Sequence, residues 1–133
     1  MVPAEQTSLR RVLIVDDDRH FLRAVELYLA SDLQLVLASS GEAALEVLDT
    51  QSFDVVVSDM NMSGISGVEF IKQARQVAPA TIYMLLTASR DSSIAIQAFN
   101  EAGIYMMVSK PCDLKDLREC IFAAGNEYDK QVG

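Results

Sequence analysis

The chain contains little of what several common classes of protein require. Its two cysteines, Cys112 and Cys120, have a spacing that matches neither a metal motif nor a disulfide framework. Its single histidine, His20, has no second histidine and no cysteine pair near it in the sequence, so we expect a partly exposed helix residue. These absences argue against a cysteine or histidine metal site and favour a cytoplasmic protein with reduced thiols.

Basic charge and long apolar runs are also scarce. Lysine and arginine number 11 against 19 aspartates and glutamates, a formal net charge of −8. This balance argues against a nucleic-acid partner, because phosphate backbones attract a surplus of Lys and Arg. No apolar run approaches the ~20 residues of a membrane span, and residues 1–8 lack the apolar core of a signal peptide. We therefore expect a cytoplasmic protein that contacts neither nucleic acid nor membrane.

The length and composition favour a single domain. A chain of 133 residues, half of them hydrophobic, forms one core rather than two. We predict a polar N-terminal extension over residues 1–9, one domain over residues 10–125, and a C-terminal tail or the start of a linker helix over residues 126–133.

Short apolar runs alternate with helical patterns throughout the predicted domain. Strands are predicted at residues 12–15, 33–38, 53–57, 81–86 and 104–108. Helices are predicted at residues 19–30, 42–48, 67–76 and 91–102, and from a cap at Asp113 onward. This alternation indicates an α/β fold, a doubly wound five-stranded parallel sheet with helices on both faces. At this length the common strand order is the flavodoxin-like 2-1-3-4-5.

Polar side chains follow four of the five predicted strands. They are Asp16, Asp17 and Asp18 after the first strand, Ser58 and Asp59 after the third, Thr87 after the fourth, and Ser109 and Lys110 after the fifth. In an open parallel sheet, ligands bind outside the carboxyl ends of the strands, where the strand order reverses. With the order 2-1-3-4-5 that point lies between the first and third strands, which carry the aspartates.

Crowded carboxylates at this edge require a cation. Two carboxylates about 4 Å apart repel by roughly 4 kcal/mol at an effective dielectric constant of about 20. Mg²⁺ relieves such repulsion at sites with few carboxylates and several waters, and Lys110 adds a fixed positive charge. A carboxylate beside a metal, a lysine and a hydroxyl is equipped to attack a phosphoryl group. For Asp18, capping of the following helix or plain solvation is the favoured interpretation.

The motifs RVLIVDDD, DVVVSDMNMSG, MLLTAS and VSKP, in this order, resemble the receiver domains of two-component response regulators, the chemotaxis-regulator-like family. The resemblance covers about residues 10–124. It implies a signalling switch in which Asp59 accepts a phosphoryl group from a histidine kinase, a phosphotransfer protein or a small donor such as acetyl phosphate. It also implies that the domain catalyses only its own phosphorylation and dephosphorylation, and so is not an enzyme in the usual sense.

The same resemblance implies a role for each residue of the site. Asp17 and Asp59 would bind Mg²⁺ directly, Asp16 would do so through water, and Asn61 would offer its backbone carbonyl. On activation Thr87 would donate a hydrogen bond to one phosphoryl oxygen, and Lys110 would pair with another. A cis peptide bond between Lys110 and Pro111 is also implied.

Two positions depart from the family pattern. Ser63 stands where receivers usually carry proline, which predicts a less rigid loop after the acceptor. Met107 stands where the switch aromatic is expected, and Tyr105 lies two residues earlier as a displaced substitute. We therefore predict that phosphorylation occurs while the output change is smaller or differently routed. Ser89 and Arg90 occupy positions at which family members tune the dephosphorylation rate.

Other functions fit less well. A haloacid-dehalogenase-type phosphatase would use Asp16 and Asp18 as its Asp-x-Asp motif. This sequence lacks the later acidic pair at a strand end that such an enzyme needs, and the assignment leaves Asp59 without a role. A flavodoxin-like cofactor binder would need a phosphate-binding loop, which this sequence lacks. A receiver-like binding module that works without phosphorylation stays open because of Met107. The partner kinase, an effector domain beyond residue 133 and a homodimer through the face from the fourth strand to the fifth helix also stay open.

Overall fold

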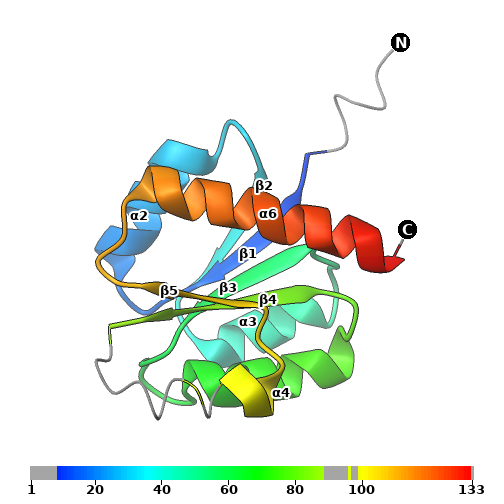
Figure 1. Cartoon of the computed structure of the whole chain (residues 1–133). Coiled ribbons are helices and arrows are strands. Elements are labelled where there is room, and N and C mark those ends of the chain that lie inside the picture. The colour runs from blue at the N-terminus through cyan, green and yellow to red at the C-terminus, as the bar shows by residue number, and fades with distance from the viewer. Residues whose placement is uncertain (1–8, 89–95, 97–98, 133) are drawn as a thin grey trace.

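The computed structural model describes residues 9–88, 96 and 99–132, which form one α/β sandwich (Figure 1). Its sheet consists of β1 (Arg11–Val15), β2 (Gln34–Ala38), β3 (Val55–Asp59), β4 (Ile82–Thr87) and β5 (Met106–Ser109). All neighbouring strands pair in parallel, in the order β2-β1-β3-β4-β5. The doubly wound, flavodoxin-like fold predicted from the sequence is therefore confirmed.

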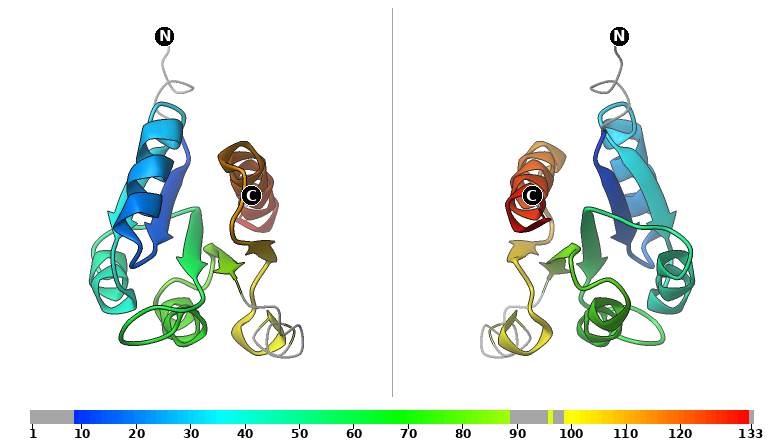
Figure 2. Two further views of the ribbon diagram at one scale, coloured as in Figure 1. Left: turned by 90° about the vertical axis from the view of Figure 1, so that its left-hand side faces the viewer. Right: turned by 90° about the vertical axis from the view of Figure 1, so that its right-hand side faces the viewer.

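Helices cover both faces of this sheet. The helices are α2 (Arg19–Leu29), α3 (Gly41–Leu48), α4 (Gly67–Val77) and α6 (Leu114–Val132). Figure 2 shows α2 and α6 on one face and α3 and α4 on the other. Within the described ranges, none of these helices is long and apolar enough to cross a membrane.

The strands alternate their side chains between two hydrophobic clusters. On β1, Leu13 and Val15 face the α3 and α4 side, whereas Val12 and Ile14 face the α2 and α6 side. All four side chains are fully buried, as expected for a central strand of a sheet covered on both faces. This double burial explains why the strands appear in the sequence as continuous apolar runs.

Polar caps start the helices that follow the strands. Asp18 caps α2, and its Oδ1 accepts hydrogen bonds from the backbone N–H groups of His20 and Phe21 at 3.0 and 3.2 Å. Ser40 and Ser66 cap α3 and α4 in the same way. These side chains satisfy N–H groups that have no partner inside the helix. The capping interpretation of Asp18 is confirmed.

Several element boundaries differ from the prediction. β3 covers residues 55–59 instead of 53–57, because the pairing with β4 extends to Asp59 opposite Leu86. β5 begins at Met106 instead of residue 104, because Gly103, at φ 69°, and a hydrogen bond from Ile104 N–H to the Phe99 carbonyl end the preceding helical turn. Of the predicted helix 91–102, residues 96 and 99–102 are helical, and the rest, with Ser89 and Arg90, lies outside the described residues.

The last helix continues beyond the predicted domain end at residue 125. α6 runs to Val132, and Arg10 fastens this extension to the amino edge of the sheet. The Arg10 guanidinium donates to Asp129 at 2.6 and 2.8 Å and to Asp54, at the start of β3, at 3.3 Å. The domain limits themselves stay a prediction.

Candidate functional site

The carboxyl ends of four strands bring the predicted polar residues to one edge of the sheet. Asp16 follows β1 directly and is fully buried, and Asp59 is the last residue of β3, with 8% of its surface exposed. Thr87 ends β4 and Lys110 follows β5. The parallel registers of β1, β3, β4 and β5 align these ends, because residues of similar depth in each strand pair directly.

Lys110 lies at the centre of this group. Its ammonium Nζ donates to Asp16 Oδ2 at 2.8 Å and to Asp59 Oδ1 at 3.3 Å. The same nitrogen lies 4.6 Å from the centroid of the Phe21 ring on α2. The peptide bond between Lys110 and Pro111 is cis, as predicted. One cation therefore links carboxylates from two strands of the sheet.

The pKa values show how these charges are balanced. Burial raises the pKa of Asp59, and the negative charge of Asp16 raises it further, while Lys110 and a backbone hydrogen bond from Asn61 act in the opposite direction. Burial lowers the pKa of Lys110, but the hydrogen bond to Asp16 and the charges of Asp16 and Asp59 together outweigh burial and raise it. Lys110 therefore stays charged, and a further cation beside Asp59 would favour its ionised form.

Three carboxylates at this edge could hold a metal ion. Asp16, Asp17 and Asp59 each offer one oxygen, and these oxygens all lie within 4.8 Å of one another among the described residues. The donors are carboxylate oxygens alone, which suits a hard divalent cation rather than a soft one. Lys110 neutralises only part of the negative charge of the three groups. The side chains therefore fit the divalent cation that the sequence predicts.

Ser63 makes the loop after β3 contact this acidic cluster. Its backbone N–H and its hydroxyl donate to Asp17 Oδ2 at 3.0 and 3.3 Å. A proline at this position would have no N–H to donate. Ser63 thus ties the loop to Asp17 by a contact that the usual family residue could not make, and the predicted looser loop stays a prediction.

The remaining predicted residues lie on or next to β4 and β5. The Thr87 hydroxyl donates to the sulfur of Met60 at 3.3 Å. Met107 is partly buried against the cluster on the α3 and α4 face. Tyr105 precedes β5 and has 39% of its surface exposed, and its backbone N–H donates to the Tyr83 carbonyl at 2.8 Å. The ring of Tyr105 therefore already has access to solvent in this structure.

Two contacts of the site were not predicted from the sequence. Phe21 lies within the predicted helix over residues 19–30, and Met60 directly follows Asp59. Their contacts with Lys110 and Thr87 depend on how α2 packs beside the end of β5 and on the path of the chain after β3. Neither arrangement has a signal in residue spacing.

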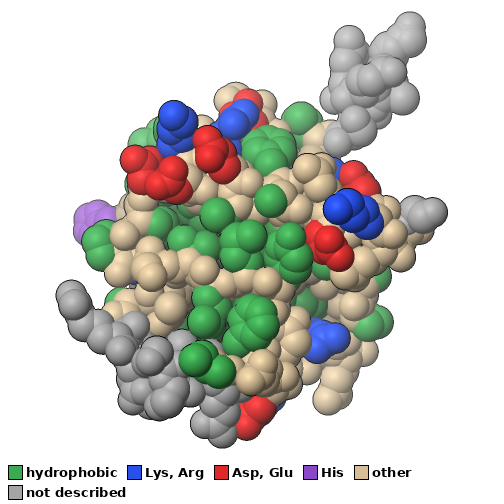
Figure 3. Space-filling model, viewed as in Figure 1, with side chains coloured by type: hydrophobic (Ala, Val, Ile, Leu, Met, Phe, Trp, Pro, Cys, Tyr) green, Lys and Arg blue, Asp and Glu red, His purple; other side chains and the backbone are tan. Residues whose placement is uncertain are grey.

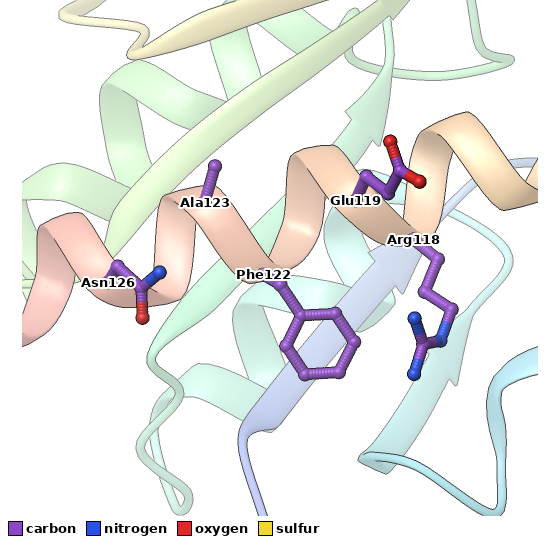
Figure 4. A pocket seen from close by; sticks show the side chains of 5 residues that line it. All are labelled: Arg118, Glu119, Phe122, Ala123 and Asn126. Atoms are coloured by element: carbon purple, nitrogen blue, oxygen red, sulfur yellow. The ribbon is translucent and has the colours of Figure 1, made fainter.

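A hollow of about 400 Å³ lies along α6, away from the acidic cluster (Figure 4). Its lining residues are Arg118, Glu119, Phe122, Ala123 and Asn126. The face that α6 and β5 present also carries a central group of hydrophobic side chains (Figure 3). The hollow therefore shares no lining residue with the acidic cluster at the strand ends, which includes the exposed Asp17.

Comparison with known proteins defines the class to which this fold and site belong. The family model for the response regulator receiver domain matches residues 12–122. A receiver domain from Clostridium thermocellum has a similar structure at 28% identity, with a TM-score of 0.82, covering 91% of this chain and 98% of that one. A chain described as adenylate cyclase from Rhodopirellula baltica matches at 34% identity, with a TM-score of 0.86, covering 91% and 90%.

The chain belongs to the response regulator receiver domain family. Among curated relatives, the hydrogenase transcriptional regulatory protein HoxA of Cupriavidus necator is 34% identical over 75% of this chain. The DNA-binding transcriptional regulator NtrC of Escherichia coli is 30% identical over 90% of this chain. The chain spans only 21% and 26% of the lengths of these two regulators. It is a receiver domain of the kind that such response regulators carry.

Proposed function

We propose that this receiver domain is switched by phosphorylation of Asp59 in a Mg²⁺-dependent reaction. The observation that carries the proposal is the position of the Lys110 ammonium, 2.8 Å from Asp16 and 3.3 Å from Asp59, beside a third carboxylate. A buried carboxylate next to a fixed cation and a cation-binding cluster combines a nucleophile with the charge that phosphoryl transfer requires.

Asp59 would act as the nucleophile. One carboxylate oxygen attacks the phosphorus of the donor and forms an acyl phosphate, while the bond from phosphorus to the donor nitrogen or oxygen breaks and the donor keeps that electron pair. Lys110 is placed to leave its bond with Asp59 and pair with a phosphoryl oxygen. Thr87, which ends the neighbouring strand β4, would donate its hydroxyl to another phosphoryl oxygen in place of the Met60 sulfur.

Asp17 and Asp59 would hold Mg²⁺ directly, Asp16 would contact it through water, and the Asn61 backbone carbonyl would complete the set. A bound Mg²⁺ would neutralise charge on the transferring phosphoryl group. The carboxylate oxygens lie close enough together to share one ion. Because Ser63 holds one oxygen of Asp17, the other oxygen of that carboxylate is left for the ion.

The partners follow from this chemistry. The donor would be a cytoplasmic histidine kinase or phosphotransfer protein, and the domain would catalyse only its own phosphorylation and dephosphorylation. The relatives are transcriptional regulators more than three times as long, so an effector domain beyond α6 is the expected recipient of the signal. The apolar face that α6 and β5 present (Figure 3) is the surface through which we expect homodimers to form.

Intact-mass measurement after incubation with acetyl phosphate and Mg²⁺ tests this function. We expect the wild-type chain to gain one phosphoryl group, and Asp59→Asn or removal of Mg²⁺ to abolish the gain. Asp54→Asn, which removes a carboxylate at the opposite edge of the sheet, is the control that should still be phosphorylated. A mass gain in Asp59→Asn equal to that of the wild type would refute the assignment of the acceptor.

The second candidate is a receiver-like module that binds its partner without phosphorylation. Met107 favours it, because a thioether replaces the ring that usually reports the state of the threonine. If acetyl phosphate and a panel of phosphohistidine donors all leave the wild-type mass unchanged, this candidate is the better one.

A further inference from the structure

A ring on α2 contacts the lysine on which the proposed chemistry depends. The centroid of Phe21 lies 4.6 Å from Lys110 Nζ, within the ~6 Å over which an ammonium is attracted to an aromatic face. Phe21 is partly buried and packs against the core cluster between the sheet, α2 and α6. A lysine at this distance interacts with the ring as well as with the two carboxylates.

The position of Phe21 is fixed through the acidic residues of the same site. Asp16 Oδ1 accepts a hydrogen bond from the backbone N–H of Asp18 at 2.9 Å. Asp18 in turn caps α2 and accepts from the backbone N–H of Phe21 at 3.2 Å. Lys110 donates to Asp16 Oδ2 at 2.8 Å and its ammonium contacts the aromatic ring of Phe21. These four residues therefore form a closed circuit of contacts. The third aspartate of the DDD motif therefore acts on the site indirectly, by placing Phe21.

The geometry of the ammonium explains why an aromatic side chain suits this place. Lysine carries three N–H donors on a flexible four-carbon stem. Asp16 and Asp59 accept two of these donors. A ring face attracts the cation without offering a third strong acceptor that would draw Nζ away from the acceptor carboxylate. An aliphatic side chain would fill the space without this attraction.

We propose that Phe21 is a positioning residue, which holds the Lys110 ammonium beside Asp59 through its ring face. Phe21 would act on phosphoryl transfer through Lys110, whose ammonium its ring contacts. The proposal rests on the proposed function, because the position of Lys110 matters only if Asp59 is phosphorylated.

Fluorination of the ring provides the sharpest test. Replacement of Phe21 by mono-, di- and trifluorophenylalanine keeps the shape of the side chain and progressively weakens the negative potential of its face. With acetyl phosphate and saturating Mg²⁺, we expect the maximal phosphorylation rate constant to fall stepwise with each fluorine. The fall should reach on the order of 3- to 10-fold for the trifluoro ring. The thermal unfolding midpoint should change little across the series.

Substitutions by standard amino acids supply the matched comparisons. Phe21→Leu should slow phosphorylation as the trifluoro ring does, and Phe21→Tyr, which keeps an aromatic face, should restore most of the wild-type rate. Phe122→Leu is the control, because it removes another cation–aromatic pair, with Arg118 at 4.7 Å on α6, outside the acidic cluster. This control should leave the rate unchanged.

The outcomes separate the two proposals. A wild-type chain that gains no phosphate contradicts the proposed function itself. A wild-type chain that is phosphorylated at the same rate as the whole fluorinated series overturns the role of Phe21 alone. A rate loss in Phe21→Leu with none in the fluorinated series would show that volume rather than the ring face matters, and would also overturn the proposal.

Discussion

Tyr83 of β4 shows how a single buried side chain makes stability depend on pH. Its hydroxyl donates to the Ala78 carbonyl at 2.8 Å, and only 1% of the residue is exposed. Burial raises the pKa of Tyr83 to about 12. The ordinary pKa of tyrosine is about 10, so the folded protein holds this proton more tightly than the unfolded chain.

The protonated form of Tyr83 thus stabilises the folded state. This contribution is fully present below pH ~10 and is lost as the pH rises toward 12, and its size is about 2–3 kcal/mol. We expect the free energy of unfolding, measured by urea titration at a series of pH values, to fall over this window. Tyr83→Phe has no ionisable group, so its decline should be shallower than that of the wild type. Parallel curves for the two proteins would contradict the prediction.

Individual residues also show which parts of the site the sequence can predict. Asp16, Asp17, Asp59 and Lys110 could be placed together because each follows an apolar run, and the ends of parallel strands meet at one edge. Phe21 occupies a helix position whose spacing indicates core packing alone. Its contact with Lys110 depends on the angle between α2 and β5, which only the three-dimensional structure defines.

At the scale of elements, the start of α4 lies unusually close to the proposed acceptor. Gly67 is the first residue of α4, and its N–H donates to the Met60 carbonyl at 2.9 Å. A Cβ at this position would lie 2.0 Å from the backbone oxygen of Asp59. Glycine therefore allows the helix to begin directly against the end of β3.

Gly67→Ala should move α4 away from β3 or distort the backbone of Asp59. We expect a loss of about 1–3 kcal/mol in the free energy of unfolding, together with slower phosphorylation by acetyl phosphate. Gly125→Ala is the matched control, since the three atoms nearest a Cβ there all belong to the side chain of Arg10 rather than to backbone. Equal stability losses in the two variants would show that the backbone contact at Gly67 is not the cause.

The boundaries of elements were predicted less well than their order. β5 was predicted from residue 104 because Ile104 and Tyr105 extend its apolar run, but the turn at Gly103 delays pairing until Met106. The sequence left residues 126–133 open between a tail and the start of a linker helix, and α6 continues as a helix to Val132. The Arg10 contact with Asp129 that fastens this extension joins residues 119 positions apart, beyond the reach of any local pattern.

At the scale of the whole molecule, the proposed phosphorylation site must influence a distant surface. Thr87 ends β4 and pairs with Ser109 of β5, whereas Met107 lies earlier in β5, opposite Leu85. A methionine has three flexible torsions and adapts to a change around it without moving as a rigid ring does. Tyr105 already has 39% of its surface exposed, so we expect its ring to move little on activation.

We therefore expect a weak response of the outer surface to activation. Beryllofluoride with Mg²⁺, a mimic of the phosphoryl group, should shift the amide resonances near Asp59 and Thr87 strongly, and those of β5 and α6 only slightly. Met107→Tyr restores a ring at the switch position and should enlarge the shifts at β5 and α6 at least about twofold. This size corresponds to the few-fold change in population that a free-energy difference of about 0.5–1 kcal/mol between two states produces. The measurement is a pair of ¹H–¹⁵N correlation spectra for each protein.

Met106→Tyr is the control for that comparison, because Met106 belongs to the same strand but packs toward α2 and α6. It adds a ring to β5 without placing it on the Met107 side, so its shifts should stay close to those of the wild type. Large shifts at β5 and α6 in the wild-type chain, unchanged in Met107→Tyr, would show that Met107 transmits the signal as well as an aromatic residue does. The coupling between site and surface would then run through the backbone of β4 and β5, whose ladder joins Thr87 directly to Ser109.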